Sequence, residues 1–214
     1  MTYQEAYQKA RGELKAVGIP EPESDAWILL EHVTGMTRTR YYVDGFERMP
    51  KNEKDRFFEL VSCRKTRIPV QHLTGVQEFM GYEFAVNEHV LVPRQDTEIL
   101  VEEAEKRLLL MKKENPVKVL DMCTGSGCIL LSLLLELPQA LGTGVDVSEG
   151  ALCVAKENRK RLGLEQRAEL IQSDLFSADY FQKNSGNDHM EYDMLISNPP
   201  YIRTEDIEGL MEEV

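Results

Sequence analysis

The sequence has no long apolar run and contains only one tryptophan, four cysteines and four histidines among its 214 residues. Its longest apolar stretch, 129–137, is interrupted by Ser132 and Glu136 and is far shorter than the roughly 18 residues that span a bilayer. The first five residues are polar and acidic, unlike a secretory signal. We therefore expect a cytoplasmic protein that does not bind a membrane.

The few cysteines and histidines form no pattern that holds a metal. The sequence contains no Cys-x-x-Cys pair and no Cys/His spacing typical of zinc, and it has no Ser/His/Asp arrangement either. Free thiols in a reducing compartment are expected at Cys63, Cys123, Cys128 and Cys153. Any chemistry of this chain is therefore expected to proceed without a metal.

Positive charge is also scarce, and the deficit is uneven. The net charge is −12; residues 1–90 hold 12 basic and 14 acidic side chains, whereas residues 91–214 hold 13 and 23. Nucleic acid is bound largely through its phosphates, which an acidic surface repels. We therefore expect no nucleic-acid partner.

The chain is rich enough in apolar residues (42%) to form one domain or two small ones. Residues 1–75 show helical spacing: one helix ends near Gly18, a second is expected to be capped by Ser24 and to stop at Gly35, and a third begins near Asn52. This pattern predicts a small all-α bundle.

The pattern then changes to strands. Alternation over 78–87, followed by 90–92, predicts a β-hairpin or two short strands forming a linker at 76–92. A helix is expected to follow 93–98 and to reach about Asn115. Strands are predicted at 117–121, 144–147, 168–172 and 192–197, with helices at 127–137 and 149–162. This alternation predicts an α/β, Rossmann-like domain over 93–214, with ligands at the carboxyl ends of parallel strands.

The first candidate motif, Asp121–Gly127, connects the first strand to its helix. Its glycines permit a sharp turn and close approach to a ligand. Leu130 stands where the dinucleotide fingerprint requires a third glycine, so nicotinamide binding is not predicted. The alternative is a tight connection without a ligand.

The next two motifs follow the second and third strands. Asp146 is placed to accept ribose hydroxyls, or alternatively to cap the next helix. In Ser173–Phe176, Asp174 could accept from an exocyclic amine while Leu175 or Phe176 packs on the base; a helix cap with a core aromatic is the alternative.

The sharpest motif is Asn198–Tyr201, Asn-Pro-Pro-Tyr, after the last strand. Two prolines cannot continue a central strand, so they form a rigid corner. The Asn198 side-chain oxygen and the Pro199 carbonyl offer two acceptors for a planar NH₂ group, and the Tyr201 ring offers a stacking face. The alternative is a strand-end turn without a ligand.

Such a corner suits transfer of a methyl group to an amide or aromatic amine. The lone pair of that nitrogen is delocalised, so it must be oriented toward an electrophilic methyl, such as that of a sulfonium donor. Positioning can contribute about 7–11 kcal/mol. The attacked nitrogen becomes acidic after transfer, so no strong base is required.

Together these motifs resemble those of the protein-(glutamine-N5) methyltransferases that modify peptide chain release factors. The matching stretches are 71–75, 91–98, 121–128, 144–148, 173–176 and 198–202. Asn-Pro-Pro-Tyr alone is shared with adenine-N6 DNA methyltransferases, but the full set behind a helical domain is more specific. The resemblance implies a class I S-adenosylmethionine-dependent methyltransferase domain.

The resemblance also implies the ligands and their contacts. S-adenosylmethionine would be the co-substrate and S-adenosylhomocysteine the product, with no metal. The acceptor would be the glutamine of a release factor's Gly-Gly-Gln motif. The residues implied to bind the donor are Cys123, Thr124, Gly125, Ser126, Gly127, Asp146, Asp174, Leu175 and Asn198.

The substrate side is implied in the same way. The residues implied to bind substrate are Asn198, Pro199, Pro200, Tyr201 and Arg94, with Asn198, Pro199 and Tyr201 catalytic. The helical domain would dock the release factor. The basic cluster Arg64, Lys65 and Arg67 would either help in docking or form a solvated surface.

The chain departs from the resembled pattern in three places. Gln95 stands where the family usually has proline, and Cys123 where it often has glycine. The family has a seven-stranded sheet, whereas four strands are predicted before Val214, so the C-terminal strands are expected to be missing. The alternatives are an adenine-N6 DNA methyltransferase and a truncated, non-catalytic interaction module. A monomer is expected.

Overall fold

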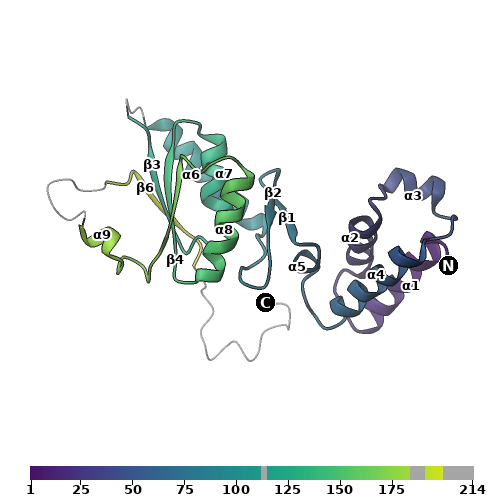
Figure 1. The fold of residues 1–214 in the computed structure, drawn as a ribbon. Coiled ribbons are helices and arrows are strands. Elements are labelled where there is room, and N and C mark those ends of the chain that lie inside the picture. The colour runs from purple at the N-terminus through teal and green to yellow at the C-terminus, as the bar shows by residue number, and fades with distance from the viewer. Residues whose placement is uncertain (112–114, 184–190, 200–214) are drawn as a thin grey trace. The chain divides into compact units, whose positions relative to one another are not determined.

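The computed structural model describes residues 1–111, 115–183 and 191–199 (Figure 1). The chain divides into two compact units: a helical unit, Met1–Thr74, and a sheet unit that begins at Gly75. The hairpin predicted as a linker belongs to the sheet unit. The domain boundaries 1–75, 76–92 and 93–214 stay a prediction.

The helical unit packs short helices around an apolar core. Its helices are α1 (Tyr3–Ala16), α2 (Pro22–Thr34), α3 (Arg38–Asp44), α4 (Lys51–Arg64) and α5 (Val70–Thr74). Thr2 and Glu5 form a capping box at the start of α1. Ala6, Ala10 and Leu14, spaced by four residues, form the buried face of that helix. The predicted all-α bundle is confirmed.

Two details of this unit differ from the prediction. Helix α2 begins at Pro22, and its N-cap is Glu21, so the predicted cap at Ser24 is wrong. The fixed φ of proline suits the first turn of a helix, so α2 begins at Pro22, upstream of the position expected from a cap at Ser24. The predicted stop is confirmed, because Gly35 has a left-handed φ of +62°.

The basic cluster has a structural role that the sequence did not reveal. Arg64 is 3% exposed, and its Nε donates to Oδ2 of the buried Asp25 at 2.7 Å. Arg67 donates to the carbonyls of Val17 and Gly18 at 2.7 and 3.0 Å. The expectation of a solvated or docking surface is therefore wrong for Arg64, and Arg67 ties the unit's own backbone together.

The sheet unit opens with the predicted hairpin. Strands β1 (Val76–Phe79) and β2 (Tyr82–Ala85) pair antiparallel. The turn consists of Met80 and Gly81, both with positive φ (53° and 75°), as a two-residue type I′ turn requires. Residues 90–92, predicted as a possible strand, are not part of one.

A helix follows as predicted but ends earlier. A short 3₁₀ turn (Gln95–Thr97) leads into α6 (Glu98–Leu110), which stops before the expected end at Asn115. The last four residues of the helix include Leu109 and Leu110, which are exposed.

The central sheet has four parallel strands among the described residues. They are β3 (Lys118–Met122), β4 (Leu141–Asp146), β5 (Ala168–Gln172) and β6 (Met194–Ser197), in the order β5-β4-β3-β6. The predicted strands are confirmed, and β4 starts three residues earlier than expected. The predicted α/β fold with a parallel sheet behind an all-α bundle is confirmed.

Helices cover the two sides of the sheet unequally. Helices α7 (Cys128–Glu136), α8 (Glu149–Arg161) and α6 lie on one side, and the short α9 (Asp179–Lys183) lies on the other (Figure 1). Close packing of α7 depends on a glycine: a Cβ on Gly142 would lie 2.5 Å from Leu130 Cδ1. On the other side, Leu195 of β6 is 55% exposed.

Candidate functional site

The parallel sheet brings the predicted motifs to one edge. Met122, at the end of β3, pairs with Ser197 at the end of β6, and the Ser197 hydroxyl donates to the Met122 carbonyl at 2.6 Å. Cys123 and Asn198 come directly after these two neighbouring strands, which run about 4.8 Å apart. The glycine-rich loop and the Asn-Pro corner therefore start side by side.

The glycine-rich loop, Cys123–Gly127, turns by repeated left-handed residues. Cys123, Gly125 and Gly127 have φ angles of 63°, 55° and 81°. Glycine adopts this conformation without steric cost, whereas for cysteine it is strained. The backbone conformation at Cys123 thus favours glycine, the residue that the resembled family often has at this position.

Hydrogen bonds to the strands fix this loop. The Thr124 hydroxyl donates to Asp121 Oδ2 at 2.6 Å, and the Thr124 N–H donates to the Val145 carbonyl at 2.9 Å. The Gly127 N–H donates a hydrogen bond to the Thr124 carbonyl at 2.8 Å. The loop is therefore pre-organised by the ends of β3 and β4.

Asp146 joins the loop to the ends of β4 and β5. Its Oδ2 accepts from the Gly125 N–H and its Oδ1 from the Ser148 N–H, both at 2.9 Å. Its carbonyl accepts from the Ser173 N–H at 3.0 Å. Helix α8 is capped by the Ser148 side chain, so the alternative that Asp146 is the helix cap is wrong. Each carboxylate oxygen keeps a lone pair for a hydroxyl donor.

The segment after β5 is open to solvent. Leu175 is 55% exposed with a φ of 51°, a conformation uncommon for leucine and often associated with binding sites. Phe176 is 51% exposed and meets Phe181 edge-on. The alternative of a core aromatic at Phe176 is therefore wrong, and Asp174 is exposed beside it.

The corner after β6 is held by a residue that the sequence analysis missed. The Asn198 Nδ2 donates to Thr97 Oγ1 at 3.3 Å, and both Asn198 and Pro199 are exposed. Thr97 lies three residues after the exposed Arg94. Pro200 and Tyr201, the other two residues predicted at this corner, lie outside the described residues.

Thr97 could be mistaken in sequence for a helix cap. It is the N-cap of α6, yet its side chain makes no capping hydrogen bond. Its hydroxyl instead accepts from Asn198, 101 residues later in the chain. The spacing of residues in the sequence does not indicate this contact, although Thr97 lies within the matching stretch 91–98.

Asp121 opens the first candidate motif but was not among the residues predicted to bind or react. Its side chain is 0% exposed, and Oδ1 has no partner of good hydrogen-bond geometry among the described residues. Burial raises the pKa of Asp121 to about 7, against the lowering effect of its hydrogen bonds from Thr124 and the Leu130 backbone. A buried carboxylate with a raised pKa beneath a candidate binding loop is a candidate functional group.

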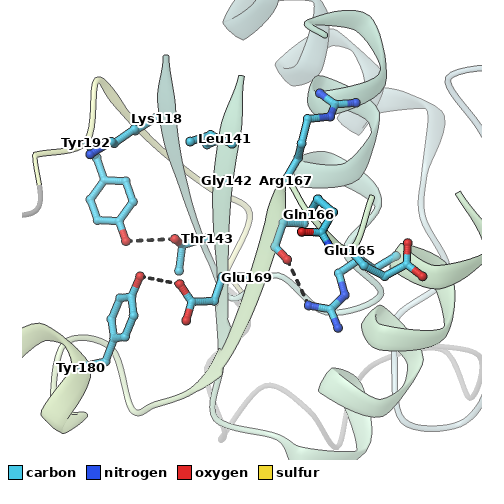
Figure 2. Close-up of a pocket in the computed structure, with 12 residues that line it drawn as sticks. Lys118, Leu141, Gly142, Thr143, Glu165, Gln166, Arg167, Glu169, Tyr180 and Tyr192 are labelled. Atoms are coloured by element: carbon cyan, nitrogen blue, oxygen red, sulfur yellow. Dashed lines mark hydrogen bonds between the residues drawn. The ribbon is translucent and has the colours of Figure 1, made fainter. Parts of the chain in front are cut away.

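A cavity of about 400 Å³ lies elsewhere in the sheet unit (Figure 2). It is lined by residues at the amino ends of the strands, such as Lys118 and Leu141, and by Tyr180 and Tyr192. Figure 2 shows Tyr192 directed toward Thr143 and Tyr180 toward Glu169. None of the predicted site residues lines this cavity, so it is distinct from the candidate site.

No helix in the described ranges is long and apolar enough to cross a membrane. Within the same ranges, no group of three or more His, Cys, Asp or Glu side chains is arranged to hold a metal ion.

Comparisons with known proteins agree with the motifs. Residues 5–75 match the family model for the PrmC N-terminal domain, and residues 95–213 match the methyltransferase small domain. The whole chain is 36% identical to the release factor glutamine methyltransferase of Caulobacter vibrioides, covering 70% of it. It is 37% identical to that of Moorella thermoacetica, covering 72%. The chain belongs to the release factor glutamine methyltransferase family.

Membership confirms the resemblance drawn from the motifs and favours it over the adenine-N6 alternative. A third relative, from Chlorobaculum tepidum, is 39% identical over 92% of this chain and 66% of its own length. The chain thus spans about two thirds of the length of such relatives. Among solved structures, human methyltransferase 10 domain containing protein aligns with 68% of this chain and 64% of its own, at 15% identity and a TM-score of 0.47.

Proposed function

We propose that this chain transfers the methyl group of S-adenosylmethionine to the side-chain amide nitrogen of the glutamine in a release factor's Gly-Gly-Gln motif. The observation that carries the proposal is the pairing of Met122 with Ser197, from which the glycine-rich loop and the Asn198 corner leave one edge of the sheet. S-adenosylhomocysteine is the second product. We further propose a monomeric, cytoplasmic enzyme without a nucleic-acid partner.

The donor side of the site fits a nucleoside with a charged tail. S-adenosylmethionine supplies an electrophilic methyl on a sulfonium. The remaining lone pairs of Asp146 suit the two ribose hydroxyls, and the exposed Asp174 and Leu175 suit the adenine. Cys123–Gly127 then face the methionine end, above the buried carboxylate of Asp121.

The acceptor side holds a planar carboxamide. Because the Asn198 Nδ2 is engaged by Thr97, the orientation of the side-chain amide is set, and no described residue donates to its Oδ1. Asn198 Oδ1 and the Pro199 carbonyl can therefore each accept a hydrogen bond from one N–H group of the substrate amide. These two bonds orient the nitrogen lone pair. We retain the predicted substrate-binding roles of Pro200, Tyr201 and Arg94, in which the Tyr201 ring stacks on the amide.

Catalysis in this arrangement is mainly positioning. Holding both reactants in line can contribute about 7–11 kcal/mol. The methylated amide nitrogen loses its proton readily, so the Pro199 carbonyl or water is a sufficient acceptor for it. We propose that the helical unit docks the release factor through surfaces other than the internally bonded Arg64 and Arg67.

A labelled-methyl assay tests the proposal. Release factor, the same factor with its Gly-Gly-Gln glutamine replaced by alanine, and DNA are each incubated with labelled donor. We expect label in the unaltered factor alone and its loss in Asn198→Ala. Asn115→Ala, an exposed asparagine that precedes β3 at the amino end of the sheet, is the matched control and should keep full activity. Label in DNA would favour adenine methylation; no label and no donor binding would favour a non-catalytic module.

A further inference from the structure

A buried asparagine on α8 connects two segments that are far apart in the sequence. Asn158 is 0% exposed, and its side chain makes three hydrogen bonds, all to backbone atoms. Its Oδ1 accepts from the Ala85 N–H at 2.6 Å, and its Nδ2 donates to the Ala85 carbonyl at 3.0 Å. The same Nδ2 donates to the Ser126 carbonyl at 2.9 Å.

The two bonds to Ala85 fasten the hairpin. Ala85 is the last residue of β2 and lies opposite Val76 of β1. Since its N–H and carbonyl both bond Asn158, they point away from β1, and the side-chain amide takes the place of a neighbouring strand. Without it, two buried backbone groups would lack partners.

The bond to Ser126 fixes the end of the glycine-rich loop. Apart from the Gly127–Thr124 bond within the loop, the loop bonds described above lead to β3 and β4, through Asp121, Val145 and Asp146. The Ser126 bond leads instead to α8. Ser126 is itself 3% exposed. Holding its carbonyl sets the plane of the peptide that joins it to Gly127, and with it the shape of the loop.

We propose that Asn158 is a positioning residue for the methyl donor, coupling the hairpin backbone at Ala85 to the glycine-rich loop. The inference rests on the proposed function, in which that loop holds the donor. Helix α8 is a rigid element, so a shift of Ala85 or of Ser126 must strain the shared amide. Donor affinity therefore depends on the hairpin, and donor binding in turn stabilises the hairpin.

Calorimetric titration with S-adenosylhomocysteine tests the first half of this coupling. Asn158→Asp keeps the shape and the acceptor for Ala85 but replaces both donated bonds with repulsion. Asn158→Ala removes all three bonds. We expect either variant to weaken binding about tenfold or more, as loss of buried hydrogen bonds implies. Wild-type affinity in a folded variant would overturn the inference.

Leu164→Ala is the matched control for lost stability. Leu164 is 1% exposed and follows α8, where it packs in the core on the α7 side of the sheet. Its truncation removes core packing at least as costly as the Asn158 bonds, yet we expect affinity within about twofold of wild type. Equal weakening by Leu164→Ala would show a merely structural role and overturn the inference. No binding by the wild-type chain would refute the proposed function itself.

Amide exchange in the wild-type chain tests the second half and needs no variant to fold. Saturation with S-adenosylhomocysteine should slow exchange of the Ala85 amide several-fold relative to the Leu108 amide in α6, because donor binding stabilises the loop to which Asn158 is bonded. Unchanged relative exchange at Ala85 in the bound chain would overturn the coupling.

Discussion

Asp25 in the helical unit and Asp121 in the sheet unit are both buried carboxylates, but different groups face them. Asp25 is held by the Arg64 guanidinium at 2.7 Å. Asp121 Oδ2 accepts a hydrogen bond from the Thr124 hydroxyl, and Asp121 Oδ1 lacks a well-aligned hydrogen-bond partner among the described residues. A buried charge with its counterion is a structural element, whereas a buried carboxyl without one retains a cost that function can use.

The same contrast extends beyond these two residues. In the helical unit, buried and half-buried charges such as Lys65 and Glu13 are matched within the unit. In the sheet unit, the groups at the carboxyl edge of the sheet, Asp146 and Asn198, are bonded to loops and remain accessible. These charges of the helical unit are thus paired, whereas the polar groups at the carboxyl edge of the sheet keep exposed atoms.

Removing Asp25 should produce the largest effect on stability. Asp25→Ala leaves the Arg64 guanidinium buried without its counterion, which costs about 3–5 kcal/mol. Chemical denaturation followed by circular dichroism measures the loss. Asp55→Ala, at an exposed ion pair on α4, should change stability by less than about 1 kcal/mol. A loss below 1 kcal/mol for Asp25→Ala would remove the contrast between the two aspartates.

Replacing Asp121 by a neutral side chain should raise stability, whereas removing Asp25 lowers it. The folded pKa, about 7, lies above the ordinary value of 3.8, so the folded chain retains a proton that the unfolded chain loses. This contribution to stability is complete below pH 3.8 and is lost as the pH rises through 7. Asp121→Asn should therefore be more stable at pH 8 by up to about 4 kcal/mol, with little difference near pH 4. Denaturation curves at both pH values measure the change, and a gain that does not grow with pH would contradict it.

Thr97→Val should separate positioning from folding. The variant keeps the size of the side chain but removes the acceptor that orients the Asn198 amide. We expect kcat to fall about 10- to 100-fold, because small misplacements are costly in positioning catalysis. Stability and the affinity for S-adenosylhomocysteine should stay close to wild type. Thr97→Ser should restore the rate; an unaffected rate in Thr97→Val would exclude the role.

Cys123→Gly should have the smallest effect. Glycine relieves the left-handed strain at φ 63° but gains freedom in the unfolded chain, which leaves a net gain of about 0.5 kcal/mol. Cys153→Gly on helix α8 makes the same substitution where no strain is relieved and should lose about 1 kcal/mol. Thermal denaturation compares the two, and equal losses would show that the loop is not strained.

The sheet and the edge that carries the candidate site could be predicted because their sequence patterns are local. Apolar strand segments alternate with segments of helical periodicity, and the motifs at Gly125, Asp146 and Asn198 lie at or just after the carboxyl ends of strands. Parallel topology then brings strand ends together whatever the details of packing. The short α3 could not be predicted, since it has no buried face to produce a periodic pattern.

The contacts that refine the site depend on partners distant in sequence. Asn158 lies 32 residues from Ser126 and 73 from Ala85, and Arg64 lies 39 residues from Asp25. Each is a polar residue on a helix and is typical of a solvated face when only its neighbours are considered. Only the fold places it inside, so sequence patterns could not distinguish it from surface residues.

The single tryptophan gives the helical unit an optical signal of its own. Trp27 is 4% exposed, with the Arg38 guanidinium 4.0 Å from its ring centre and Tyr41 edge-on. Because residues 75–214 contain no tryptophan, indole fluorescence follows the helical unit alone. A red shift without loss of sheet ellipticity would therefore reveal a chain whose helical unit melts while its sheet unit stays folded.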